Sequence, residues 1–438
     1  MRCLSILRGH TSVDAAALQG RTLLRLGRSD EAVEILEHGL AKSAELPHRN
    51  RAELEMLHAS ALANVGRIPE ATAAFDDARA YVQASMCPAL EAEFDLLEAL
   101  AYFMARNPRR CEVGCAKALA PAPFVFGPMP HFVPIEHTRA RVYSLRGYIA
   151  ASVGHYGDQL RHARRSVDEL ESCPIPDEWL RLTMLSHVAM LAREMGDLRE
   201  AAFVRRRLNE ATWIEELAPI RYEILRSLAW LSAIRGDHLS AFRDLRAAMD
   251  LATSNSLRLA VSVDKAYLAR ELRQDVVARE ELDYAERLSD SINWEELGNG
   301  EIDVLVRFAQ ALAPENAAKA RSLLSRYRRL RGARQSIHPS SFDERARLIE
   351  VVADGIICRA EGRIERAIEL LQDAFVRWTK SRHKWRAAIV AVELAELGAG
   401  NSSNSFLGEQ AALYPNSWIA LRAGAALSAG ESTRQSQA

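Results

Sequence analysis

Apolar residues recur along most of the chain at intervals of three and four positions. The segment VEILEHGL, which follows Ala32, places Val33, Ile35, Leu36 and Leu40 mainly on one face of a helix. The same spacing follows Ala71 and Ala367. Only 22 Gly, 15 Pro and 7% aromatic residues argue against a turn-rich sandwich or barrel. The pattern therefore predicts an all-α protein of amphipathic helices.

A short sequence signature interrupts these helices at regular intervals. It reads LGRSDEA at 26–32, VGRIPEA at 65–71, MGDLREA at 195–201, RGDHLSA at 235–241 and EGRIERA at 361–367, with a looser copy, VGHYGDQ, at 153–159. The spacings between successive signature glycines are close to multiples of about 40 residues. These turn glycines are Gly27, Gly66, Gly154, Gly196, Gly236 and Gly362. Glycine-poor copies are expected near Arg106, Gln274 and Pro314.

Small residues flank each turn at fixed distances. Seven positions before the glycine stand Gly20, Ala59, Gly147, Ala189, Ala229 and Gly355. Five positions after it, five of the six copies have Ala, and Gln159 is the exception. Small side chains let two successive helices approach closely, and the glycine allows the left-handed backbone that ends the first helix.

This combination resembles the tetratricopeptide repeat over residues 11–428, with a period of about 40 residues instead of that family's 34. The resemblance implies a right-handed α-solenoid of about ten antiparallel helix pairs, ending in a capping helix near 416–428. It is also similar to the sensor region of large LuxR-type, maltose-regulator-like transcription factors. The closing segment LGEQAALYPNSWIALRAGAAL resembles the last repeat of that group, so we expect a DNA-reading helix-turn-helix module to be missing or to belong to another chain.

Proline-rich and polar stretches divide the expected array. We expect helix pairs over 1–119, a loop over 120–137, central pairs over 138–331, a loop over 332–342, C-terminal pairs and the capping helix over 343–428, and a polar tail over 429–438. The first loop holds five of the fifteen prolines, which forbid helix continuation.

Composition narrows the classes of function. The chain has 438 residues with 57 Lys+Arg against 58 Asp+Glu, which excludes a globally basic nucleic-acid binder. Six scattered cysteines and the lack of a secretory or membrane-spanning apolar run predict a cytoplasmic protein. One Arg cluster, 326–334, and the smaller groups at 161–165 and 205–207 fit a phosphate contact. A structural role explains these groups better, because Arg side chains near helix C-termini complement the helix dipole and cover apolar surface with their stems.

Candidate chemistry is sparse. No phosphate-binding, dinucleotide-binding, nucleophile-elbow or metalloprotease motif is present. Cys111, Cys115, His131 and His137 loosely have the spacing of a zinc site, but buried structural cysteines explain the first two better. We therefore expect no enzyme, no metal and no cofactor.

The concave groove is the best-motivated site. In tetratricopeptide proteins the first helix of each pair lines a surface that takes peptides or partner helices. Counting back from the turn glycines predicts the lining residues Arg141, Tyr148, Ser186, Met190, Arg193, Glu223, Arg226 and Trp230. Arg and Trp dominate binding hot spots, although Trp230 could equally fill a gap between helices. We expect a non-enzymatic scaffold or sensor for a protein segment, peptide or small effector, with neither membrane nor direct nucleic-acid binding. The alternative is the ligand-sensing part of a LuxR-type regulator.

Overall fold

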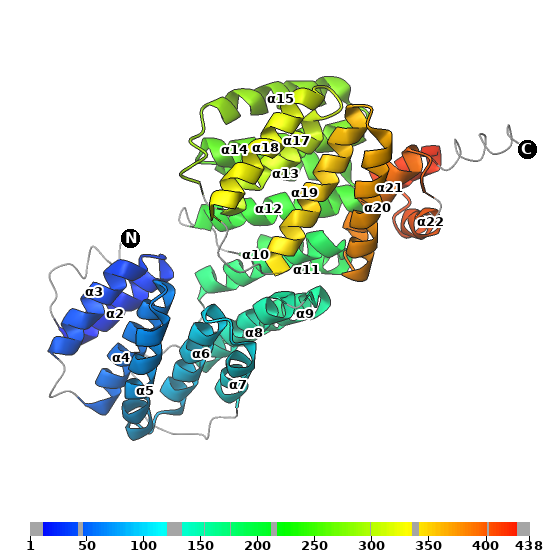
Figure 1. Cartoon of the computed structure of the whole chain (residues 1–438). Helices are drawn as coiled ribbons and strands as arrows, with labels where there is room; N and C mark the ends of the chain where they lie inside the picture. Colours follow the sequence, from blue (N-terminus) through cyan, green and yellow to red (C-terminus); the bar gives the residue numbers. More distant parts are fainter. Residues whose placement is uncertain are drawn as a thin grey trace, which may run out of the picture. The chain divides into compact units, whose positions relative to one another are not determined.

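The computed structural model describes residues 12–42, 47–120, 134–152, 154–175, 177–211, 217–297, 299–334, 341–400 and 403–426. Within these ranges the chain forms 21 labelled helices and no strand (Figure 1). The helices of the first half are α2 (Val13–Arg25), α3 (Ser29–Ala41), α4 (His48–Asn64), α5 (Ile68–Ala84), α6 (Pro88–Met104), α7 (Pro108–Ala118), α8 (Ile135–Ser152), α9 (Tyr156–Glu171), α10 (Glu178–Met195) and α11 (Leu198–Glu210).

The second half continues in the same manner. Its helices are α12 (Ala218–Arg235), α13 (His238–Leu251), α14 (Asn255–Glu271), α15 (Asp275–Asp290), α16 (Asn299–Ile302), α17 (Val304–Leu312), α18 (Ala317–Arg334), α19 (Ser341–Ala360), α20 (Ile364–Lys380), α21 (Lys384–Glu396) and α22 (Asn404–Leu413). A further helical segment covers 418–426, within the range expected for the capping helix. Among all the described residues, no helix is long and apolar enough to span a bilayer.

Successive helices form the expected repeat. Without the short α16, the helices from α2 to α22 make ten consecutive pairs in the described ranges. Close packing within a pair is seen for α4 with α5, α12 with α13, α14 with α15 and α19 with α20. The predicted all-α fold of about ten antiparallel helix pairs is confirmed.

The turn residues explain where the first helix of a pair ends. All six signature glycines have φ between 69° and 86°, the left-handed region that only glycine enters without strain. Arg106 and Arg273 take the same conformation, each with φ 58°, at two of the places where a glycine-poor copy was expected. The backbone N–H of the next residue then bonds back into the helix, as Arg67 does to Leu62 O at 2.9 Å.

The small residue before each turn lets the two helices of a pair meet. A Cβ added to Gly20 would lie 2.6 Å from Leu36 Cδ2, and one added to Gly355 would lie 2.9 Å from Leu371 Cγ. Both leucines stand sixteen positions after the glycine, on the second helix, and both are fully buried. The small residue of the signature therefore marks a direct contact between the two helices of a pair.

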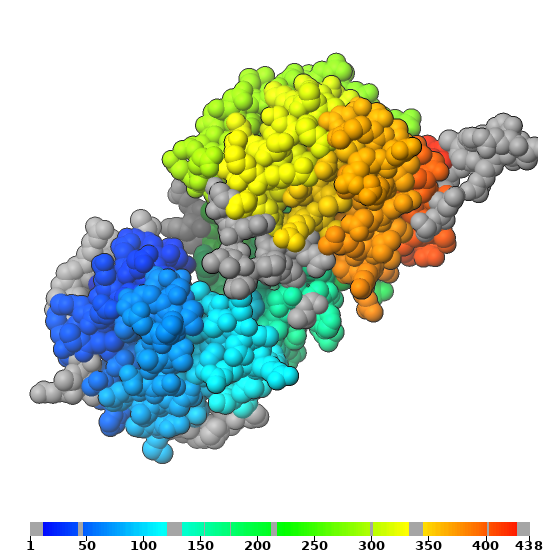
Figure 2. Space-filling view, viewed as in Figure 1, coloured from blue at the N-terminus to red at the C-terminus, as the bar shows by residue number. Residues whose placement is uncertain are grey.

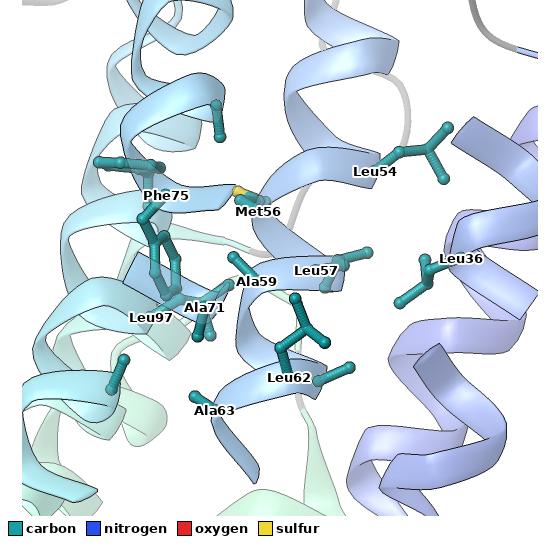
Figure 3. Packing of buried hydrophobic residues seen from close by; sticks show 14 of the residues in the cluster. Leu36, Leu54, Met56, Leu57, Ala59, Leu62, Ala63, Ala71, Phe75 and Leu97 are labelled. Atoms are coloured by element: carbon teal, nitrogen blue, oxygen red, sulfur yellow. The ribbon is translucent and has the colours of Figure 1, made fainter. Parts of the chain in front are cut away.

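Buried side chains join neighbouring pairs into a continuous core. In the first pairs, Leu54, Met56 and Leu57 of α4 lie between the helices that carry Leu36 and Phe75 (Figure 3). Phe75 also meets Phe94 of α6 edge-on, with ring centroids 5.7 Å apart. These first helix pairs thus bury their apolar faces against one another, as in other helical repeats.

The chain divides into two compact units. Unit 1 contains residues 1–150 and 161–181, and unit 2 contains residues 151–160 and 182–438. In unit 2 the yellow and orange surfaces of α18, α19 and α20 lie side by side (Figure 2).

The two expected loops are shorter than predicted. Helix α8 begins at Ile135, so residues 135–137 are helical. Helix α18 runs to Arg334 and α19 starts at Ser341, so both ends of the 332–342 loop are helical as well. Residues 121–133 and 335–340 lie outside the described residues. The helices reach further because no proline lies between Ile135 and Ser152, or between 332 and 337.

The end of the chain packs back onto the start of unit 2. The Tyr414 hydroxyl donates to Gly196 O at 3.0 Å. A Cβ at Gly236 would collide with the backbone oxygen of Asn416. Trp418 is fully buried, and its ring centroid lies 5.7 Å from that of Trp385. The closing segment thus joins the last repeat to the turns after α10 and α12.

Candidate functional site

A cavity of about 620 Å³ lies within unit 2. Most of its lining comes from the first helices of six successive pairs, α10, α12, α14, α17, α19 and α21. The remaining contacts include Tyr327 of α18 and Trp378 of α20. The wall combines apolar side chains, among them Val263, Ile349 and Ile389, with a large set of Arg, Asp and Glu residues.

Glu194 is the centre of the first charged cluster. Its oxygens accept from Arg386 Nε at 2.6 Å and Nη2 at 2.9 Å. Arg193 Nη2 lies 3.1 Å from the same carboxylate, and Arg345 Nη2 lies 3.0 Å from it. Glu194 is only 2% exposed. Three guanidinium groups from α10, α19 and α21 therefore converge on one buried carboxylate.

Asp264 of α14 is the centre of the second cluster. Arg226 donates to Asp264 Oδ2 through Nε at 3.0 Å and Nη2 at 2.7 Å. Arg307 donates to Oδ1 at 2.7 Å. Asp264 is fully buried and the Arg226 side chain is 6% exposed. This cluster ties α12, α14 and α17 together at the cavity wall.

Both carboxylates remain ionised. Burial favours their neutral forms, but the guanidinium groups outweigh burial and hold the pKa of Glu194 well below its ordinary value. The pKa of Asp264 is lowered in the same way by Arg226 and Arg307. Burial lowers the pKa of Arg193, because the attraction of Glu194 does not fully compensate it.

An aromatic wall stands beside the charged clusters. Trp230 and Tyr267 have ring centroids 5.5 Å apart, and both line the cavity together with Trp385. Arg386 Cζ lies 5.6 Å from the ring centroid of Trp378, a cation–π distance. Arg and Trp side chains in one concave surface are typical of binding hot spots.

Two further acids line another part of the wall. Asp303 accepts from the Tyr327 hydroxyl at 3.2 Å, and burial raises the pKa of Asp303. Glu301 accepts from Ser256 Oγ at 3.0 Å.

Five of the eight predicted groove residues line this cavity. They are Met190, Arg193, Glu223, Arg226 and Trp230. Ser186 is not part of the lining. Arg141 and Tyr148 belong to unit 1, where Arg141 Nη1 lies 4.0 Å from Glu93 Oε1 and Tyr148 stands 6.4 Å from Phe103, centroid to centroid.

The same register finds much of the lining that sequence reasoning missed. Seven of the eight predicted residues stand 13, 10 or 6 positions before a turn glycine, and Arg193 stands three positions before Gly196. Counted from Gly362, these positions are Ile349, Val352 and Ile356, and all three line the cavity. Counted from Arg273, they are Ala260, Val263 and Tyr267, which line it as well. The charged residues Asp264, Arg307, Arg345 and Arg386 fall at other spacings, so no single position in the repeat identifies them.

Several of the other residues singled out in the sequence have structural partners. Cys111 and Cys115 are buried in a core formed with α6 and α8, and hydrogen bonding to Cys115 together with burial raises the pKa of Cys111. His137 Nε2 lies 3.1 Å from Ile175 O, and His131 lies outside the described residues. Arg328 is paired with Glu350 and Asp354. Over the residues that the structure describes, no group of three or more His, Cys, Asp or Glu is arranged to hold a metal ion.

No family model and no curated protein matches this chain. Solved structures with a similar course of helices include a Rap protein complexed with competence and sporulation factor, with a TM-score of 0.45 and 14% identity over 83% of this chain and 100% of that chain. The apo form of RapI has a TM-score of 0.47 and 12% identity over 96% and 99% of the two chains. The APC/C hetero-tetramer Cut9–Hcn1 has a TM-score of 0.30 and 13% identity over 97% and 92%. Likenesses of this size say nothing about what the chain binds.

Proposed function

We propose that this chain is a non-enzymatic binding protein that takes a short peptide or a small effector into the cavity of unit 2. The cavity itself carries the proposal. Its volume of about 620 Å³ falls within the roughly 300–1,000 Å³ typical of sites for small ligands. Six helices of the repeat supply its wall, in the place where tetratricopeptide-like proteins bind their ligands.

The chemistry of the two charged clusters favours binding over catalysis. A general base needs a pKa near the working pH. Glu194 and Asp264 are each held in the ionised state by two or more guanidinium groups, and their lowered pKa values make them weak proton acceptors. Aromatic rings and Arg side chains in one cavity provide anchors for a ligand.

A cavity-filling variant tests the proposal. Ala346 lines the cavity on α19 and is partly exposed, so Ala346→Trp places an indole in the ligand's space. Ala318, exposed near the start of α18, gives the matched control Ala318→Trp. Random peptides displayed on mRNA are selected against the wild type, and the affinity of each selected peptide is measured by fluorescence polarisation. A metabolite panel is screened in parallel by thermal shift.

The expected result is a loss of affinity of about tenfold or more in Ala346→Trp, which corresponds to about 1.4 kcal/mol, and little change in Ala318→Trp. Ligands that bind both variants as tightly as the wild type would place the binding surface elsewhere. The absence of any binder from either collection would refute the proposal.

The alternative role, as the ligand-sensing part of a LuxR-type regulator, rests on the resemblance of the closing segment. It predicts a helix-turn-helix module encoded downstream or in an adjacent reading frame. A genomic neighbourhood without such a module would remove its main support. The cavity would serve as the effector site in that role as well.

A further inference from the structure

The Glu194 cluster has far more hydrogen-bond donors than its carboxylate can use. Each guanidinium carries five N–H donors, whereas a carboxylate offers about four acceptor sites. Arg193, Arg345 and Arg386 together therefore bring about fifteen donors to Glu194. Their formal charges sum to three positive against one negative. The cluster can accept another anion without losing its present contacts.

Burial shows which groups face the cavity. The Glu194 side chain is 2% exposed, while Arg193, Arg345 and Arg386 are 19%, 17% and 25% exposed. The carboxylate is therefore more deeply buried than the three Arg side chains around it, and all three of these side chains line the cavity. Planar guanidinium groups suit carboxylate and phosphate oxygens because they can donate two parallel bonds.

The other charged residues of the cavity wall have contacts of their own. Five Arg and five Asp or Glu residues line the cavity in total. Asp264 already binds Arg226 and Arg307. Glu223 lies 3.6 Å from Arg226 and is 49% exposed.

Glu301 and Asp303, the last two acids of the lining, are hydrogen-bonded to Ser256 and Tyr327. The three guanidinium groups that contact Glu194 give an excess of positive charge around that carboxylate, while Asp264 attracts Arg193 and Asp303 attracts Arg345 from further away.

We propose that Arg193, Arg345 and Arg386 bind an oxyanion of the ligand, either a carboxylate or a phosphate group. The apolar part of that ligand lies against the partly exposed Ile349 and Ile389 of the same cavity wall. This inference rests on the proposed function and specifies the chemistry of its site.

The position of the cluster gives anion binding a second effect. Glu194 and Arg386 are 192 residues apart in sequence, and they join α10, at the start of unit 2, to α21, near its end. An anion held by Arg193 and Arg386 adds a bridge between these two helices. A ligand that binds the folded state alone raises its stability, so unit 2 should unfold at higher temperature when the anion is bound.

Pyrophosphate and defined peptide pools test the proposal. The chain is melted with pyrophosphate, with sodium chloride at matched ionic strength, with N-acetylated random pentapeptides that have a free C-terminal carboxylate, and with the same pool as C-terminal amides. The cavity variant is the double substitution Arg345→Gln with Arg386→Gln. The matched control is Arg321→Gln with Arg328→Gln, which removes two ion-paired Arg residues outside the cavity.

Pyrophosphate or the free-acid pool should raise the melting temperature of the wild type and the control by a few degrees beyond chloride. The cavity variant should lose this shift. Stabilisation by the free acids but not the amides identifies a carboxylate, and stabilisation by pyrophosphate alone identifies a phosphate group. If circular dichroism shows that the double variant is unfolded, Arg345→Lys replaces it. This change keeps the charge, removes the planar fork and should weaken binding several-fold.

A wild type that responds to neither anion would overturn the proposal, and so would a folded cavity variant that responds as strongly as the wild type. Ligands whose binding is lost in Ala346→Trp but unchanged in the Arg variants would leave the proposed function intact and refute the oxyanion site alone.

Discussion

Removing the Asp264 carboxylate should destabilise unit 2 strongly. The substitution Asp264→Asn keeps the size of the side chain and removes its charge. Arg226, which is 6% exposed and donates two hydrogen bonds to this carboxylate, then has no ionised partner at Asp264. Arg307 also loses its carboxylate partner, but its side chain is 28% exposed, so water screens the unpaired charge.

The magnitude follows from the two environments. Breaking a buried ion pair by removing one partner costs about 3–5 kcal/mol, because the other charge remains buried. A solvent-screened pair contributes at most about 1 kcal/mol. The total is therefore about 3–5 kcal/mol, dominated by Arg226. In a unit of this size that loss corresponds to a fall in melting temperature of roughly 10 °C.

Urea unfolding followed by tryptophan fluorescence measures the effect, since Trp230, Trp378, Trp385 and Trp418 all belong to unit 2. The double variant Asp264→Leu with Arg226→Met replaces the pair by apolar side chains and should recover most of the loss. A loss below about 1 kcal/mol in Asp264→Asn, or no recovery in the double variant, would refute the assignment of a buried ion pair.

The pH dependence has a definite sign. The pKa of Asp264 is lowered in the folded state, so its contribution is present above the unfolded value of about 3.9. It is lost as the pH falls through the lower folded value. The difference between the wild type and Asp264→Asn should therefore be constant near neutral pH and should shrink below about pH 4.

Three further predictions concern packing and titration in unit 2. Gly355→Ala should destabilise the folded state by about 1–3 kcal/mol, because its Cβ would press on the buried Leu371. A Cβ at Gly408 in α22 meets nothing within 4 Å, so Gly408→Ala should stabilise the folded state by up to about 1 kcal/mol. Urea midpoints compare the two variants, and equal effects would contradict the packing argument. Burial and the nearby Glu393 raise the pKa of Glu271 to about 7 against the opposing pull of Arg422, which donates to Glu271 at 2.8 Å. Its stability contribution is therefore full below pH 4.5 and lost as the pH rises through 7. The melting temperature of Glu271→Gln relative to the wild type should be higher at pH 8.5 than at pH 5, and the same difference at both pH values would count against the shifted pKa. Trp418→Ala should cost about 3–5 kcal/mol and expose the closing segment to limited proteolysis, and an unchanged cleavage pattern would show that this segment is held by other contacts.

The helix repeat was predictable because its signals are local. A turn glycine and two small residues are required within each repeat unit, and they can be read in every copy that keeps them. The turn near Arg106 was found by spacing alone, because a regular array leaves a place for it. By contrast, Arg382 has φ 61° between α20 and α21, and no residue type in the sequence marks that conformation.

The cavity was predictable only in part. Its apolar lining follows the repeat register, so Trp230 and Tyr267 occupy equivalent positions in successive first helices. The Glu194 cluster does not follow the repeat register, because its members come from α10, α19 and α21 and meet only when unit 2 folds. The sequence predicted Arg226 as a ligand contact, and the structure shows in addition that Arg226 forms an ion pair with Asp264. A long-range ion pair leaves no local pattern in a single sequence.

The return of the closing segment to the start of unit 2 changes how this half of the chain should fold. In an open array each repeat touches only its neighbours, so repeats can fray, fold or be deleted one at a time. Tyr414 and Gly196 are instead joined across 218 residues, and contacts between distant residues slow folding because a long loop must close first. The part of unit 2 from α10 to residues 414–418 should therefore unfold in one cooperative step, with neither α10 nor residues 414–418 free to fray alone.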